Sequence, residues 1–198
     1  MSKNNPIGKD DVMRKRRWFP KAWYHITARG NRKAEIFYDD RDRFKYLELL
    51  REAKFSHPFH LHSFCLMSNH VHLLIETIDI PPGTFMKDLH SQYAIYFNKK
   101  YGFTGHLFQG PYKAQLQGDV NAILQVSRYI HLNPCRALLT FNPEDYKWSS
   151  YSHYLSPSPF YSDLITTSTI LSYFKDIKQY EFFVQLENKV RPGHPSNG

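Results

Sequence analysis

The chain has 198 residues, of which 41% are hydrophobic and 16% aromatic, a composition that can supply the core of one domain and excludes disorder throughout. The hydrophobic runs are too short to cross a bilayer, no secretory signal is visible, and two cysteines are too few for a disulfide framework. The formal net charge of +8 favours a polyanionic partner, above all nucleic acid, although an ordinary basic enzyme fits it as well. We therefore expect a protein of the reducing cytoplasm that binds no membrane.

The N-terminal part of the chain predicts a leader, a strand and a helix. Residues 1–13 are polar and we interpret them as a loose leader. Four adjacent cations follow, and they suit either an arm that contacts phosphates or a solvated tail: Arg14, Lys15, Arg16 and Arg17. Residues 23–28 mix β-branched and aromatic side chains as a strand does, and residues 41–55 carry hydrophobic side chains at helical spacing after two aspartates that can cap a helix.

The remaining pattern predicts an α+β protein. In chain order we expect two strands joined by a short turn, a helix, a strand, a helix that begins after Asp119 and stops at Pro134, and a final helix: 59–66, 70–77, 85–100, 113–117, 120–133 and 168–189. The order β-α-β-β-α-β predicts a ferredoxin-like or RRM-like antiparallel sheet with helices on one face.

The first chemically informative feature is the pair His70 and His72. On a strand, alternate side chains share a face, so these two imidazoles point the same way about 6.6 Å apart, while Val71 between them faces the core. Two imidazoles at this spacing can bind one divalent ion together with a further ligand from elsewhere. Two half-buried surface histidines remain the alternative, and the clean alternation makes the two interpretations about equal.

The second feature is the end of the helix that precedes Pro134. Tyr129 and Asn133 are four residues apart, so both lie on one helical face. The Asn133 carbonyl oxygen is a suitable ligand for a hard cation, and Tyr129 would then hold its phenol beside the same ion. A phenol with an ordinary pKa of about 10 needs help with its proton to act as a nucleophile. Core packing or a surface hydrogen bond is the alternative for Tyr129, one of 14 tyrosines.

Five segments in one order resemble the single-tyrosine HUH transposases of bacterial insertion sequences, and most closely their REP-associated branch. They are WYHITARG (23–30), CLMSNHVHLLI (65–75), GHLFQG with Tyr112 and Lys113 (105–113), RYIHLNP (128–134) and WSSY (148–151). The resemblance spans roughly residues 16–154. It implies an HUH endonuclease domain over 14–155, followed by a C-terminal extension over 156–198 that we expect to be helical with a frayed tail.

The resemblance implies a bacterial enzyme of DNA recombination and transposition, active at the nucleoid in the cytoplasm. In it, Tyr129 would cleave single-stranded DNA, form a 5′-phosphotyrosine link, free a 3′-hydroxyl and rejoin strands. His70 and His72 would bind the metal, Mg²⁺ or Mn²⁺, with Asn133 as third ligand. The substrates implied are hairpin-forming repeats, and the chain would act as a monomer or a homodimer.

Ten basic residues along the chain form a candidate path for DNA phosphates, and we make this prediction for the set rather than for any single residue. They are Arg14, Lys15, Arg16, Arg17, Arg29, Arg32, Lys99, Lys100, Lys113 and Arg128. Phe103, Phe108 and Tyr112 are candidates to stack on unpaired bases. Two positions depart from the family pattern. Pro111 stands where an arginine is usual, which removes a cation, and Cys135 stands where a small aliphatic residue is usual.

Three other classes of protein compete with this hypothesis. A nucleic-acid-binding module on the same sheet could have lost catalysis, although His70, His72 and Tyr129 are all present. A metal hydrolase that uses water would want more carboxylates, and Glu76 is the only acid near the histidine pair. Plasmid relaxases and replication initiators share the pair, but they often have a second tyrosine on the helix, where this chain has Gln125 and Asn133.

Overall fold

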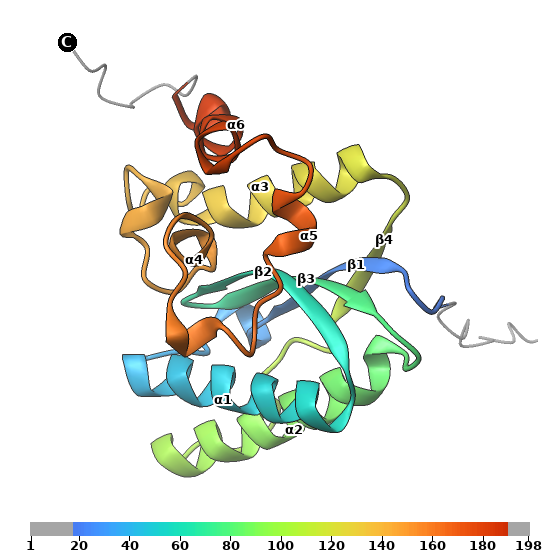
Figure 1. Ribbon diagram of the computed structural model, residues 1–198. Coiled ribbons are helices and arrows are strands. Elements are labelled where there is room, and N and C mark those ends of the chain that lie inside the picture. Colours follow the sequence, from blue (N-terminus) through green and yellow to red (C-terminus); the bar gives the residue numbers. More distant parts are fainter. Residues whose placement is uncertain (1–17, 190–198) are drawn as a thin grey trace, which may run out of the picture.

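The protein is described by a computed structural model that covers residues 18–189, so the leader, the cations at 14–17 and the frayed tail lie outside the described residues. Four strands form one antiparallel sheet in the order β2-β3-β1-β4. Their bounds are β1 Trp23–Arg29, β2 Phe59–Met67, β3 His70–Thr77 and β4 Lys113–Gln117. This order puts β1 and β3, which carry the first two sequence motifs, side by side at the centre of the sheet (Figure 1).

The helices occupy both faces of the sheet. Helices α1 (Asp40–Ser56) and α2 (Pro82–Tyr101) cover one face, and α3 (Val120–Arg136) covers the other with α6 (Ile177–Lys189) packed on its outer side (Figure 1). The α+β class and antiparallel sheet are confirmed, but the expectation of helices on one face is wrong. The reason lies in β2, whose residues are buried from Leu61 onward on both faces and therefore need cover on both sides.

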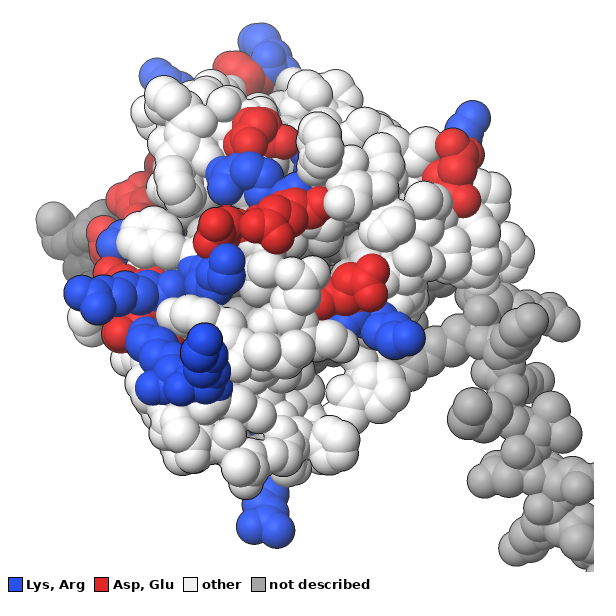
Figure 2. Space-filling model, turned by 90° about the horizontal axis from the view of Figure 1, so that it is seen from below, with Lys and Arg blue, Asp and Glu red and all other residues white. Residues whose placement is uncertain are grey.

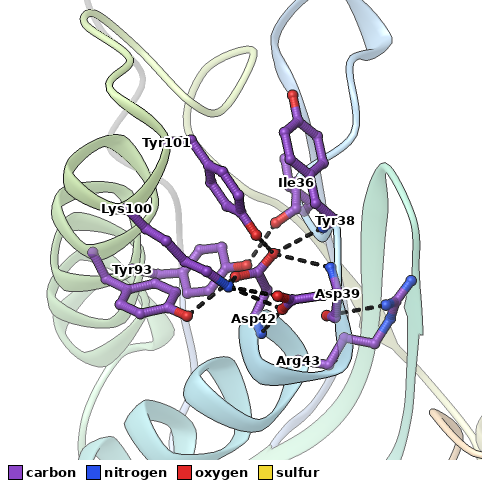
Figure 3. A network of polar contacts seen from close by, with 9 residues as sticks. Ile36, Tyr38, Asp39, Asp42, Arg43, Tyr93, Lys100 and Tyr101 are labelled. Atoms are coloured by element: carbon purple, nitrogen blue, oxygen red, sulfur yellow. Dashed lines mark hydrogen bonds and ion pairs between the residues drawn. The ribbon is translucent and has the colours of Figure 1, made fainter.

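The start of α1 is fixed by a polar network with the end of α2 (Figure 3). Asp39 and Asp42 form a capping box, in which the carboxylate of each residue accepts a hydrogen bond from the backbone N–H of the other. Asp42 is fully buried and accepts hydrogen bonds from Lys100 Nζ at 2.7 Å and from Tyr101 Oη at 2.8 Å. The Lys100 ammonium also binds Asp39 at 2.9 Å. Two helices far apart in sequence are thereby joined at one corner of the domain.

Two helix predictions need correction. Pro134 lies inside α3, which continues to Arg136. A proline in the last turn removes only one backbone N–H from the helix, and it does so close to the C-terminal end, where few further hydrogen bonds remain to be lost. The expected final helix is divided into α5 (Ser168–Leu171) and α6, with a turn and bends at 172–176 between them. Among residues 18–189, no helix combines the length and the apolar character that a membrane span requires.

The WSSY segment lies along the free edge of β2. The Leu66 N–H donates to the Trp148 carbonyl at 2.8 Å, and the Ser150 N–H donates to the Phe64 carbonyl at 3.0 Å. Ser150 Oγ also accepts from the Phe64 N–H at 2.9 Å and lies 2.8 Å from Nε2 of His131 on α3. The short helix α4 (Tyr151–Leu155) follows directly. This motif therefore ties α3 to the sheet.

Candidate active site

His70, His72 and Tyr129 meet in one open cavity of about 540 Å³ between the sheet and α3. Tyr129 reaches the cavity from α3, and the two histidines reach it from β3. The loop before β4 contributes Gln109, Gly110 and Pro111 to the lining. The full lining is Thr27, Ala28, Arg29, His70, His72, Gln109, Gly110, Pro111, Lys113 and Tyr129. Three segments that the sequence motifs singled out thus come together at one place.

The two histidines of the pair are well suited to bind a cation. Their ring centroids are 4.9 Å apart. Burial lowers the pKa of His70 to about 4 and that of His72 to about 2, so both rings are neutral near pH 7 and keep a lone pair for a ligand bond. The Nδ1 of His70 lies 2.6 Å from Oδ1 of Asn69; because that oxygen only accepts, Nδ1 carries the proton and Nε2 is left to coordinate.

Tyr129 stands beside the pair with its ring held on two sides. Its ring centroid lies 5.5 Å from that of His72, edge to face. On the other side, the guanidinium of Arg136 lies over the Tyr129 ring at 4.5 Å from the centroid, a favourable cation–π position. Arg136 is two turns further along α3, so the tyrosine ring is fixed by its own helix as well as by the sheet.

Asn133 has the expected position on α3 but its side chain does not reach the cavity. Its Nδ2 donates to the Tyr129 carbonyl at 2.8 Å, and the residue is only 7% exposed. Among residues 18–189, no three His, Cys, Asp or Glu side chains are placed to hold one ion. The donors that line the cavity are therefore the two imidazoles, and Asn133 is not among the lining residues.

The basic residues of the proposed phosphate path divide into two groups. Arg29 and Lys113 line the cavity. Arg32 and Lys99 are exposed elsewhere, and Lys100 is held by Asp39 and Asp42. Arg128 contacts α6, with its guanidinium 4.6 Å from the Phe183 ring centroid. On the face covered by α1 and α2, Lys and Arg lie beside Asp and Glu (Figure 2), so the helical face carries mixed charge.

The aromatic candidates and the two departures also have defined places. Phe108 stacks on His90 with ring centroids 4.2 Å apart, and Phe103 contacts Phe97; both rings therefore already have partners within the protein. Pro111 lines the cavity beside Gly110. Cys135 is buried, and its thiol donates to the Phe141 carbonyl at 3.4 Å, so it packs under the turn that follows α3.

The sequence did not single out His25, although it belongs to this cluster. Its Nε2 lies 3.0 Å from Nδ1 of His72, and its ring centroid is 5.8 Å from that of Tyr129. The signal available in the sequence was the alternation of β1, which places His25 on the same face as Thr27. That signal becomes informative only when β1 is known to pair with β3.

Comparison with solved structures supports the fold described above. A REP-associated tyrosine transposase, solved bound to a REP hairpin, shares the fold with a TM-score of 0.62 at 14% identity, over 79% of this chain and 86% of that one. A transposase structure from Deinococcus radiodurans R1 (18% identity, 66% and 95% covered) and the tRNA(His) guanylyltransferase of Saccharomyces cerevisiae (9%, 88% and 82%) each give a TM-score of only 0.42.

Sequence comparison identifies the family directly. Among curated proteins nothing matches. The family described as "Transposase IS200 like", however, matches residues 19–133, which include β1, the histidine pair, Tyr129 and Asn133. This stretch is more than half of the 198 residues and holds every element that lines the cavity. The chain belongs to the IS200-like transposase family.

Proposed function

We propose that this transposase cleaves and rejoins single-stranded DNA, with Tyr129 as nucleophile and a divalent cation, Mg²⁺ or Mn²⁺, at His70 and His72. The observation that carries the proposal is the meeting of the tyrosine and the two neutral imidazoles in one open cavity. The cavity also contains the cations Arg29 and Lys113, which suit the backbone phosphates on either side of the cut.

In the proposed reaction the Tyr129 hydroxyl oxygen attacks the scissile phosphorus. A bond forms between Tyr129 Oη and phosphorus, the phenol proton is released, and the bond to the 3′ oxygen breaks. That oxygen takes up a proton, so a 3′-hydroxyl and a 5′-phosphotyrosine result. A second 3′-hydroxyl reverses the reaction and rejoins strands. A divalent ion bound by the pair, with Asn133 as third ligand, would neutralise charge on the phosphate and orient it.

Hairpin DNA is the substrate class we propose. The support is the fold shared with a transposase solved on a REP hairpin, together with an overall charge of +8. The phosphate backbone of any DNA attracts a protein of this charge, whatever the base sequence. The choice among DNA molecules would therefore depend on the hairpin and its flanking single strand. The protein would act in the bacterial cytoplasm on chromosomal DNA, as a monomer or a homodimer.

A denaturing gel tests the nucleophile. Labelled single-stranded hairpins, taken from REP-type repeats and from the DNA that flanks the gene, are incubated with Mn²⁺ or with EDTA. Wild type with Mn²⁺ should retain the label covalently, and Tyr129→Phe should not, because only the attacking oxygen is removed. Tyr173→Phe is the matched control, since Tyr173 is half exposed and is not among the residues that line the cavity.

The same gel separates the competing functions. An adduct that survives in Tyr129→Phe would assign the nucleophile to another tyrosine. If wild type cuts the hairpin without any adduct, water is the nucleophile and the protein is a hydrolase. If it neither cuts nor forms an adduct but shifts the hairpin on a native gel, the binding module takes the place of the transposase reaction.

A further inference from the structure

We propose that His25 is a positioning residue, which holds His72 in the one tautomer that can bind a cation from the cavity. This inference rests on the proposed metal role of the histidine pair. The two side chains come from neighbouring strands: Thr27 of β1 is opposite His72 of β3, so His25 is its diagonal neighbour on the same face. Their closest atoms are His25 Nε2 and His72 Nδ1, at 3.0 Å.

The contact between these rings is a hydrogen bond, and it needs one proton. The form of the rings that matters here is the neutral one, because a doubly protonated imidazolium has no lone pair for a cation. A neutral imidazole has one N–H and one lone pair. Either His25 Nε2–H donates to His72 Nδ1, or His72 Nδ1–H donates to His25 Nε2. A single proton between these two nitrogens allows no third arrangement.

Only the second arrangement leaves His72 able to coordinate. If His72 accepted at Nδ1, its own proton would be on Nε2, and neither nitrogen could bind an ion. If it donates from Nδ1, the lone pair is on Nε2. Asn69 imposes the same state on His70, whose Nδ1 lies 2.6 Å from Oδ1 of Asn69. Both ligands thus have Nδ1 bound by a neighbouring side chain and Nε2 left for the ion.

His25 contacts His72 but does not line the cavity, which His70 and His72 do. Its Nε2 is occupied by His72, and within residues 18–189 no third His, Cys, Asp or Glu completes a set with the pair. Its ring also meets Tyr129 edge on, at 5.8 Å. The residue therefore contacts both a proposed ligand and the proposed nucleophile.

Two replacements of His25 test separately its role as a hydrogen-bond acceptor and its role as an aromatic ring. His25→Phe keeps an aromatic ring against Tyr129 but removes the acceptor, so the Mn²⁺ affinity of the DNA-free protein should fall about 10- to 100-fold, the usual effect of losing such a partner. His25→Gln places a carbonyl oxygen close to where Nε2 stood, and should restore affinity to within a few-fold of wild type. His60→Phe, on β2 and outside the cavity, should bind Mn²⁺ as wild type does.

The readout is the electron paramagnetic resonance signal of free Mn²⁺ during titration, with nitrogen couplings in the bound state to count imidazole ligands. Wild type and His25→Gln should both show two. Equal affinity of wild type and His25→Phe would overturn the positioning role alone. Loss of one coupled nitrogen in His25→Gln would also overturn it, because His25 would then be a ligand. Absence of Mn²⁺ binding in wild type would reject the metal site, and this inference with it.

A measurement on the unaltered protein covers the case in which a variant fails to fold. Long-range ¹⁵N–¹H spectra of the histidine rings report which nitrogen carries each proton. Without metal, we expect the His72 proton on Nδ1. A proton on Nε2 of His72 would contradict the proposal directly, whatever the variants do.

Discussion

Each histidine of the pair has its Nδ1 within 3.0 Å of another side chain, Asn69 for His70 and His25 for His72. The two partners come from different places, the turn before β3 and the neighbouring strand β1. A ligand that is oriented before the ion arrives loses less freedom on binding. At the scale of single residues, the proposed metal ligands are therefore oriented in advance by side chains that need not touch DNA.

Replacement of His70 or His72 should remove one of the two proposed metal ligands. His70→Ala and His72→Ala should each weaken Mn²⁺ binding and reduce covalent adduct formation together, because two imidazoles are the donors that the cavity presents. Titration of Mn²⁺ and the adduct gel check the two effects on the same samples. Unchanged Mn²⁺ binding in both variants would reject this pair as the site.

Asp42 gives a residue-scale prediction about stability. Burial opposes its ionisation, but hydrogen bonds from Lys100, the Tyr38 N–H and Tyr101 outweigh burial and hold its pKa below the usual value. Asp42→Asn removes the charge and leaves the Lys100 ammonium facing a neutral amide, so the free energy of unfolding should fall by about 3 kcal/mol near pH 7. Urea unfolding measures the change, with Glu48→Gln, a partner of Lys45 on the exposed side of α1, as control.

The pH dependence of that difference has a fixed sign. A carboxyl whose pKa is lower in the folded state stabilises the protein fully above its unfolded pKa, about 3.9. That contribution is lost as the pH falls through the lower folded value. The difference in unfolding free energy between wild type and Asp42→Asn should therefore be constant above about pH 5 and shrink below it. A difference that grows on acidification would contradict the assigned charge state.

At the scale of elements, α3 is anchored from both sides by buried polar contacts. Ser127 Oγ lies 2.8 Å from Ser63 Oγ on β2. His131 bridges outward, with Nε2 at 2.8 Å from Ser150 Oγ and Nδ1 at 2.7 Å from Tyr180 Oη on α6. Ser127 and His131 each lie within one turn of Tyr129, so the C-terminal helix helps to hold the helix that carries the proposed nucleophile.

Tyr180→Phe tests this anchor. The change removes one hydroxyl and leaves His131 Nδ1 without its hydrogen-bond partner in a fully buried place, which should cost about 1–3 kcal/mol of unfolding free energy. Chemical denaturation checks the value. The exposed Tyr173→Phe on the same C-terminal segment should change stability by less than about 0.5 kcal/mol; an equal loss in both variants would count against the bridge.

At the scale of the whole molecule, charge should dominate DNA affinity. With a net charge of +8, the logarithm of the binding constant for a single strand should fall linearly with the logarithm of salt, by about 0.7 per phosphate contact. Lys113→Gln, in the cavity, should reduce that slope by about 0.7. Lys45→Gln, beside Glu48 on α1, should leave it unchanged. A flat titration for wild type would exclude a phosphate-binding groove.

Much of this molecule could be predicted from local pattern. The strands His70–Thr77 and Lys113–Gln117 have their predicted bounds, and Asp119 caps α3 as expected, because alternation and capping act within a few residues. His25 could not be found in this way, since its role depends on the register between β1 and β3. Likewise, helical spacing places Asn133 near Tyr129, but spacing does not fix the direction in which its amide turns.

The edges of the sheet differ in a way that matters for association with other chains. The WSSY segment occupies the outer edge of β2 through hydrogen bonds at Phe64 and Leu66, so a hydrophobic edge is closed to strand addition. The other edge is β4, which is five residues long, mostly exposed, and begins with Lys113. Short, charged edges resist pairing between chains. One edge of the sheet is thus closed to other chains by the WSSY segment, and the other resists pairing because it is short and polar. Lys113 on the second edge also lines the cavity.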